Sequence, residues 1–217
     1  MSSNDSSLFV FLLDRSGSMN DIKNDVEGAF RALIDEQKAV PGSATVSLHQ
    51  FDDTYEDVFV GLPIEQVKPL VIRPRGTTAL LDAIGRTVTA TRERIAAMPA
   101  GQRPGTVHLN IMTDGLENAS KEYTRPAIKA LLEAQEKVDK WLIAYLGTNQ
   151  DAVEVGTSLG ISPERSLTYT SATVRSAMSS YSELTTKARK ARRDGASPDA
   201  VIAGASFTDL QREEAGN

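Results

Sequence analysis

The sequence of 217 residues contains no cysteine, and this absence removes several classes of protein at once. A chain without cysteine has no disulfide framework, no thiolate nucleophile, no cysteine zinc site and no iron–sulfur cluster. Histidine is nearly as scarce, because His49 and His108 are the only two, and both fall within expected strands. We therefore do not expect a Ser-His-Asp hydrolase, whose general base would have to emerge from the middle of a strand.

The sequence also lacks an excess of basic residues and a long apolar run. Its net charge is −5 and its pI is about 5.2, whereas proteins that bind nucleic acids or anionic membranes carry a basic excess. No run approaches the roughly 20 apolar residues of a membrane-spanning helix. The N-terminal residues MSSNDSSLFVFLLD show no basic leader or cleavage site. We expect a cytoplasmic protein that binds neither nucleic acids nor membranes.

The most apolar stretch is the run of six residues from Leu8 to Leu13. It has no polar alternation, which is typical of a strand covered on both faces in the middle of a parallel sheet. Further strands are expected at 44–51, 55–60, 106–112, 141–146 and 165–170. Between them, apolar residues recur at three- and four-residue intervals, which predicts helices. One of these follows Thr124 as its cap, with Ile128, Leu131, Leu132 and Val138 facing inward.

Alternating strands and helices predict one α/β domain with a mostly parallel six-stranded sheet and helices on both faces. The strands at 44–51 and 55–60 are expected to form a hairpin whose second, more polar strand lies at the sheet edge. An α+β domain with a separate hairpin is the alternative. The domain is expected to cover residues 6–193. Residues 194–217 are expected to form a C-terminal tail, loosely packed or partly helical.

Short oxygen-bearing side chains follow the ends of two expected strands and precede one helix. Asp14, Ser16 and Ser18 come directly after the first strand, and Asp114 comes directly after strand 106–112. The segment Gly76-Thr77-Thr78 precedes the helix between them. Loops after parallel strands open on one edge of the sheet, so these side chains should converge. Such oxygens, without nitrogen or sulfur, suit a hard cation, for which Mg²⁺ fits best and Mn²⁺ and Ca²⁺ are alternatives.

The order Asp14-x-Ser16-x-Ser18, then Thr78, then Asp114 in a Thr-Asp-Gly sequence, resembles the von Willebrand factor A (vWA) domain and its metal-ion-dependent adhesion site (MIDAS). The resemblance covers about residues 6 to 190 and implies a Rossmann-like, doubly wound sheet with one antiparallel edge strand. It implies that Ser16, Ser18 and Thr78 bind the metal directly or through water, and that Asp14 and Asp114 act mainly through water. Matching the pattern selects Thr78 rather than Thr77. A partner's Asp or Glu would complete the metal shell.

Charged residues near these motifs have a functional and a simpler interpretation. Arg15 and Arg75 could steer an incoming carboxylate at the rim of the site, or they could be solvated loop charges. Asp52 and Asp53 are interpreted as solvated turn residues. Asp82 is interpreted as a charge favoured by the dipole of the helix it begins.

Two asparagines and a basic run are explained by local structure alone. Asn118 and Asn149 follow strand ends and could support the metal loops, but turn chemistry accounts for them more simply. The run from Lys187 to Arg193 is interpreted as a solvated helix end that complements the helix dipole. It lacks interleaved aromatic residues, which a nucleic-acid stacking surface would need.

The function expected from these features is non-enzymatic, metal-dependent binding of a protein partner. The resemblance suggests a bacterial or phage intracellular type that acts as an adaptor, with an AAA+ ATPase as one class of partner. The chain has no Walker A motif, so ATP hydrolysis would come from elsewhere. One alternative is a magnesium-dependent, phosphatase-like hydrolase with Asp14 as nucleophile. Ser16, however, stands where a second carboxylate would be expected. A phage or virion assembly protein is a further alternative.

Overall fold

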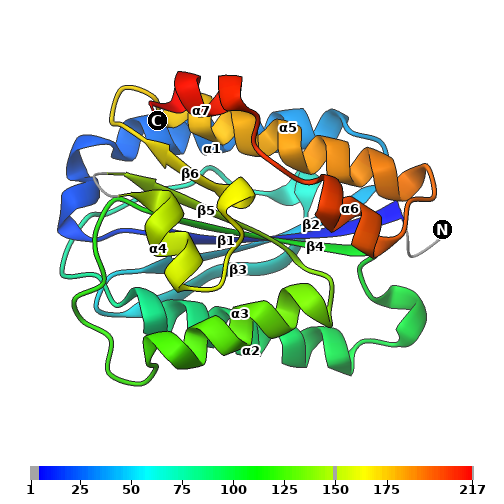
Figure 1. Cartoon of the computed structure of the whole chain (residues 1–217), viewed down its shortest axis with the longest axis horizontal. Coiled ribbons are helices and arrows are strands. Elements are labelled where there is room, and N and C mark those ends of the chain that lie inside the picture. The colour runs from blue at the N-terminus through cyan, green and yellow to red at the C-terminus, as the bar shows by residue number, and fades with distance from the viewer. Residues whose placement is uncertain (1–4, 149–150, 217) are drawn as a thin grey trace.

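The computed structural model describes residues 5–148 and 151–216, and six strands in this part of the chain form one sheet (Figure 1). The strand order is β3-β2-β1-β4-β5-β6, and every neighbouring pair is parallel except β2 and β3. The predicted fold class is thus confirmed, with an antiparallel strand at one edge, and the alternative of a separate hairpin is wrong. The strands are β1 (Ser6–Asp14), β2 (Ser43–Phe51), β3 (Tyr55–Pro63), β4 (Thr106–Thr113), β5 (Leu142–Thr148) and β6 (Ser166–Tyr169).

Helices cover both faces of the sheet, in two layers that Figure 1 shows above and below the strands. The buried residues of α1, α5, α6 and α7 form one core cluster with one face of the sheet, and those of α2, α3 and α4 form another with the opposite face. The helices are α1 (Lys23–Ala39), α2 (Leu80–Ala97), α3 (Arg125–Lys137), α4 (Ala152–Ser158), α5 (Val174–Arg193), α6 (Pro198–Gly204) and α7 (Asp209–Ala215).

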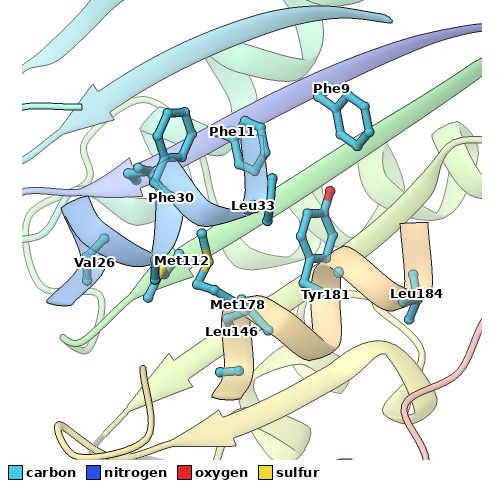
Figure 2. Packing of buried hydrophobic residues seen from close by; sticks show 14 of the residues in the cluster. Phe9, Phe11, Val26, Phe30, Leu33, Met112, Leu146, Met178, Tyr181 and Leu184 are labelled. Atoms are coloured by element: carbon cyan, nitrogen blue, oxygen red, sulfur yellow. The ribbon is translucent and has the colours of Figure 1, made fainter. Parts of the chain in front are cut away.

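Strand β1 lies inside the sheet, as its apolar run predicted, and it contributes to both core clusters. Phe9, Phe11 and Leu13 belong to the cluster under α1 and α5, whereas Leu8, Val10 and Leu12 belong to the other. Figure 2 shows Phe11 between Phe30 of α1 and Tyr181 of α5. The Phe11 ring meets both rings edge to face, with ring centres 5.1 Å apart for Phe30 and 6.1 Å apart for Tyr181. Packing on both faces fixes the strand, and with it the position of the loop that follows Asp14.

Helix α3 begins as predicted but ends before its last expected core residue. The Thr124 side chain caps it by accepting a hydrogen bond from the Ala127 N–H, and Ile128 and Leu132 are buried. Val138, expected to face inward, is 73 % exposed, so this prediction is wrong. The helix ends at Lys137, and the next residues turn toward Trp141 through Lys140, whose φ is 57°.

The basic run at the end of α5 is not simply a solvated helix end. Arg189 and Arg192 are buried, while Lys187, Lys190 and Arg193 are exposed. The Arg189 guanidinium donates hydrogen bonds to the carbonyl oxygens of residues 37, 40 and 42 and lies 5.7 Å from the centre of the Phe9 ring. The three-residue spacing of the two buried arginines places both on the inner face of the helix.

The segment after Asp194 forms α6 and α7 and packs against the cluster under α1 and α5. Val201, Ala205, Phe207 and Ala215 are buried in that cluster. Helix α7 begins with a capping box in which Thr208 and Gln211 satisfy each other's backbone N–H groups. None of the helices in the described part of the chain combines the length and apolarity needed to span a membrane.

Candidate metal site

The loop after β1 folds back on the strand end. Asp14 is buried, and its Oδ1 accepts a hydrogen bond of 2.6 Å from the Ser16 N–H. A short 3₁₀ turn, Gly17–Asp21, follows and brings the Ser18 hydroxyl to 3.1 Å from that of Ser16. The turn therefore places all three predicted side chains of the first motif at the carboxyl end of β1.

A second loop brings in Thr78, just before α2. Its backbone N–H donates to Asn118 Oδ1 at 2.9 Å, and its carbonyl oxygen accepts from the Asn118 N–H at 3.0 Å. Gly76 has a φ of 67°, and a Cβ there would lie 2.9 Å from Asp53 Oδ1, so this turn requires glycine. Asn118 thus supports the threonine loop, and turn chemistry alone does not account for it.

The third contribution comes from the end of β4. The Ser18 hydroxyl donates to Asp114 Oδ1 at 2.6 Å, and the Thr113 hydroxyl donates to Asp14 Oδ2 at 2.5 Å. A Cβ built on Gly115 would lie 2.9 Å from Thr78 Oγ1, 3.6 Å from Ser18 Oγ and 3.7 Å from Asp14 Oδ2. Oxygens of the first two motifs therefore lie close to Gly115, and the Ser18 hydroxyl connects them to Asp114. The structure brings the five predicted residues together.

The two carboxyl groups of this cluster resist ionisation. Burial, together with a smaller contribution from the negative charge of Asp114, raises the pKa of Asp14 to about 6, although hydrogen bonds from Thr113 and Ser16 oppose the shift. Burial also raises the pKa of Asp114, although its hydrogen bond from Ser18 opposes the shift. A nearby cation would favour the ionised form of both.

The chemistry of the donors fits a small hard cation. Three hydroxyls and two carboxylates converge, with only oxygen atoms, and the missing side chain at Gly115 leaves the space between them open. In residues 5–148 and 151–216, no group of three or more His, Cys, Asp or Glu side chains forms a conventional metal cluster. A site here would thus rely on hydroxyl ligands.

Asp52 is the clearest error among the predicted surroundings, because it is fully buried rather than solvated. Its Oδ2 accepts hydrogen bonds from Arg15 Nε at 3.0 Å and Arg75 Nε at 2.7 Å, and Thr54 binds its other oxygen. Burial opposes ionisation, yet the hydrogen bonds from Thr54 and Arg75 and the charge of Arg15 hold the pKa of Asp52 well below its usual range. The two arginines are 37 and 23 residues away in sequence, so local pattern could not reveal the pairing.

The two rim arginines differ in their exposure. Arg15 is buried and also pairs with Glu56, so it is not a solvated loop charge. The Arg75 side chain is 61 % exposed while it contacts Asp52. Asp53 is exposed, as expected. Only Arg75 of the two therefore presents a cationic group to solvent beside the cluster.

The sequence analysis predicted only some of the roles of the other residues near the cluster. Asp82 lies in the first turn of α2, as expected, and it also accepts hydrogen bonds from the backbone of residues 121–123. Glu117 similarly binds the Leu81 N–H and was not predicted. Thr113 was also missed, although its place directly before Asp114 was an available signal. Asn149 lies outside the described residues.

No family model matches the sequence, and no curated protein matches it. Solved structures match in shape. The vWF domain of the type V pili tip protein Mfa5 from Porphyromonas gingivalis has a TM-score of 0.59 at 10 % identity, over 85 % of this chain and 96 % of that one. The pilus adhesin SpaC from Lactobacillus rhamnosus GG, in its open conformation, has a TM-score of 0.61 at 14 % identity, over 84 % of this chain and 30 % of that one.

A von Willebrand factor type A structure from Catenulispora acidiphila matches with a TM-score of 0.56 at 14 % identity, over 84 % of this chain. This chain spans less than half of that protein, 42 % of its length, and 46 % of the mussel byssus protein PTMP1. These likenesses show that the chain has the vWA fold.

Proposed function

We propose that this vWA-fold chain is a metal-dependent protein-binding module that captures an acidic side chain of a partner. The observation that carries the proposal is that the Ser18 and Thr78 hydroxyls and a carboxylate oxygen of Asp14 lie close to Gly115, while Ser16 and Asp114 contact the Ser18 hydroxyl. Similar structures include a pilus adhesin and a pilus tip protein, which supports a role in binding another protein.

The residues of the cluster would divide the work. Ser16, Ser18 and Thr78 would hold a divalent cation directly or through water. Asp14 and Asp114 would act mainly through water and would orient the hydroxyl and water ligands. Both acids already accept hydrogen bonds, from the Ser16 N–H and Thr113 to Asp14 and from Ser18 to Asp114. When bound, the cation would supply positive charge that the neutral hydroxyls leave uncompensated, and this charge attracts an external carboxylate.

We propose Mg²⁺ as the resident ion, with Mn²⁺ and Ca²⁺ as alternatives. Mg²⁺ accepts few carboxylates and completes its octahedron with water, whereas Ca²⁺ usually takes six to eight oxygens. Arg75, exposed beside the cluster, would attract the partner's acidic group over a short range. Arg15 would instead hold Asp52 and the adjoining loop in place.

The biological setting remains part of the proposal. We place the module in the cytoplasm as an adaptor in an intracellular complex, with an AAA+ ATPase as one class of partner. The hydrolase alternative is less well supported, because both Asp14 carboxylate oxygens accept hydrogen bonds, from Ser16 and Thr113, and neither is left as a ready nucleophile.

A pull-down from lysate tests the mechanism. Tagged protein is incubated with Mg²⁺ or with EDTA, and the same is done with Ser16→Ala and with Ser179→Ala, a matched change at an exposed position on α5. We expect partners that the wild type and Ser179→Ala retain in Mg²⁺ and that EDTA or Ser16→Ala releases. Partners retained equally by all three proteins, in Mg²⁺ and in EDTA, would rule out the metal-dependent mechanism.

A further inference from the structure

Two exposed arginines of this protein differ from all its other arginines in having no partner. In residues 5–148 and 151–216, Arg31 and Arg73 are the arginines that make neither a hydrogen bond nor an ion pair. Other exposed arginines contact acids, as Arg86 contacts Glu122. The guanidinium groups of Arg31 and Arg73 are therefore available to an anion from outside the chain.

Both arginines lie where the connection between β3 and α2 packs along α1. The Ile72 N–H donates a hydrogen bond of 2.7 Å to Glu27 Oε1 in the first half of that helix. Earlier in the connection, Lys68 lines a cavity of about 300 Å³ together with Arg31 of α1. The connection therefore runs toward the amino end of α1, and Lys68 comes before Arg73 along it.

The connection presents its charges to solvent because its apolar residues anchor it. Leu70 and Ile72 are buried in the cluster under α1 and α5, whereas Arg73 and Arg75 are exposed. Pro74 favours an extended backbone at the residue before it, and side chains two apart in an extended segment point the same way. The packed apolar side thus fixes the cations on the outer side.

Three exposed cations without partners define what we call the cationic stripe, which consists of Arg31, Lys68 and Arg73. In the part of the chain that the structure describes, none of the three has a carboxylate within ion-pair distance. Two acids beside the stripe are engaged elsewhere, because Asp35 contacts Lys38 at 3.4 Å and Glu27 binds a backbone N–H. The stripe is a local excess of positive charge on a chain whose net charge is −5.

The stripe leads to the candidate metal site. Just beyond it, the Arg75 N–H donates to the Arg15 carbonyl oxygen at 2.9 Å, and the Gly76 carbonyl oxygen accepts from the Gly17 N–H at 3.3 Å. Both contacts are to the loop after β1, which carries the serines of the metal site. The connection from Lys68 to Arg75 spans at most about 25 Å, because an extended chain advances by 3.3–3.6 Å per residue.

We propose that the cationic stripe binds an acidic segment of the partner, next to the carboxylate that the metal site captures. This inference rests on the proposed function, and it adds that the partner carries several acidic residues within about eight positions of that carboxylate. Arginine recognises carboxylates through paired hydrogen bonds. A nucleic acid is a poorer candidate, because the net negative charge of the chain repels a long polyanion.

The test measures binding of a fluorescein-labelled peptide, (Glu-Gly)₅, to the full chain by fluorescence anisotropy. The buffer has low ionic strength and contains EDTA, so that the metal site contributes nothing, and (Gln-Gly)₅ is the neutral reference. The double variant Arg31→Gln/Arg73→Gln should bind the acidic peptide about three- to tenfold more weakly, since exposed ion pairs contribute modestly. Lys187→Gln/Lys190→Gln, an equal change of charge at exposed positions on α5, should weaken binding less than twofold.

A second readout locates the bound peptide. A benzophenone group at its centre should crosslink to residues 27–38 or 64–75. The inference is overturned if the acidic peptide binds no better than the neutral one, if the two double variants weaken binding equally, or if the crosslinks fall elsewhere. Tighter binding of a ten-nucleotide single-stranded DNA than of the acidic peptide would also overturn it. Because all these measurements are made in EDTA, their failure is distinguishable from failure of the metal site.

Discussion

Gly115→Ala offers a sharp perturbation of the candidate metal site, because it adds one methyl group at its centre. The new Cβ would lie 2.9 Å from Thr78 Oγ1, closer than carbon and oxygen atoms ordinarily approach, and 3.6 Å from Ser18 Oγ. Gly115 is not among the glycines with positive φ, so the backbone accepts alanine and the effect is steric. The methyl must displace the hydroxyl or occupy the space between the ligands.

The expected size of the effect follows from the cost of overpacking. Inserting a methyl into a tight site costs about 1–3 kcal/mol. If that cost falls on the metal-bound state, affinity for Mg²⁺ decreases about 5- to 150-fold. Isothermal titration calorimetry of Mg²⁺ into the two proteins measures this change directly.

The matched control is Gly28→Ala in α1, where an added Cβ meets nothing within 4 Å. That variant should bind Mg²⁺ as the wild type does, and it should be slightly more stable, by roughly 0.5–1 kcal/mol, because alanine favours the helix. If Gly115→Ala binds Mg²⁺ with wild-type affinity while remaining folded, the metal ligands do not lie against Gly115.

Two further changes test the buried charges. Asp52→Ala should destabilise the chain by about 3–5 kcal/mol in urea unfolding, since it leaves Arg15 buried without its main partner. Asp53→Ala, at the exposed neighbour, should change the stability by less than about 0.5 kcal/mol. Equal effects of the two substitutions would contradict the pairing of Asp52 with Arg15. Burial lowers the pKa of His108 from its ordinary value of 6.5 to about 3, helped by the charge of Arg189. Between these values the unfolded chain binds a proton that the folded chain does not, so stability decreases as the pH falls, by about 1.4 kcal/mol per pH unit. Urea unfolding should show that the wild type loses about 1.4 kcal/mol more stability between pH 6 and pH 5 than His108→Phe does. An equal loss in the two proteins would refute the role of His108.

The sequence predicted the sheet well because its central strands, β1, β4 and β5, are buried on both faces. A continuous apolar run such as Leu8 to Leu13 is typical of a strand that is covered on both faces. The hairpin at 44–60 has a polar second strand, which is typical of a sheet edge. The convergence of the five candidate residues could also be predicted, because a motif at a strand end is carried to the same edge of a parallel sheet.

Side-chain pairs that join distant segments could not be predicted from the sequence. Asp52 follows a strand in a hairpin, which normally signals a solvated turn, yet Arg15 and Arg75 fold over it from other loops. Arg189 was likewise part of a basic run, and its burial depends on carbonyl groups at the end of α1 some 150 residues away. Neither pairing leaves a periodic signal in the chain.

The central claim is that hydroxyls from separate loops share one divalent ion, and anomalous diffraction from crystals grown with Mn²⁺ tests it most directly. We predict an anomalous peak at roughly 2.0–2.6 Å from the hydroxyls of Ser16 and Ser18, with Thr78 reaching it directly or through one water. Crystals of Ser16→Ala should lose that peak. A map with no peak in this cluster, or a peak held only by other residues, would contradict the account.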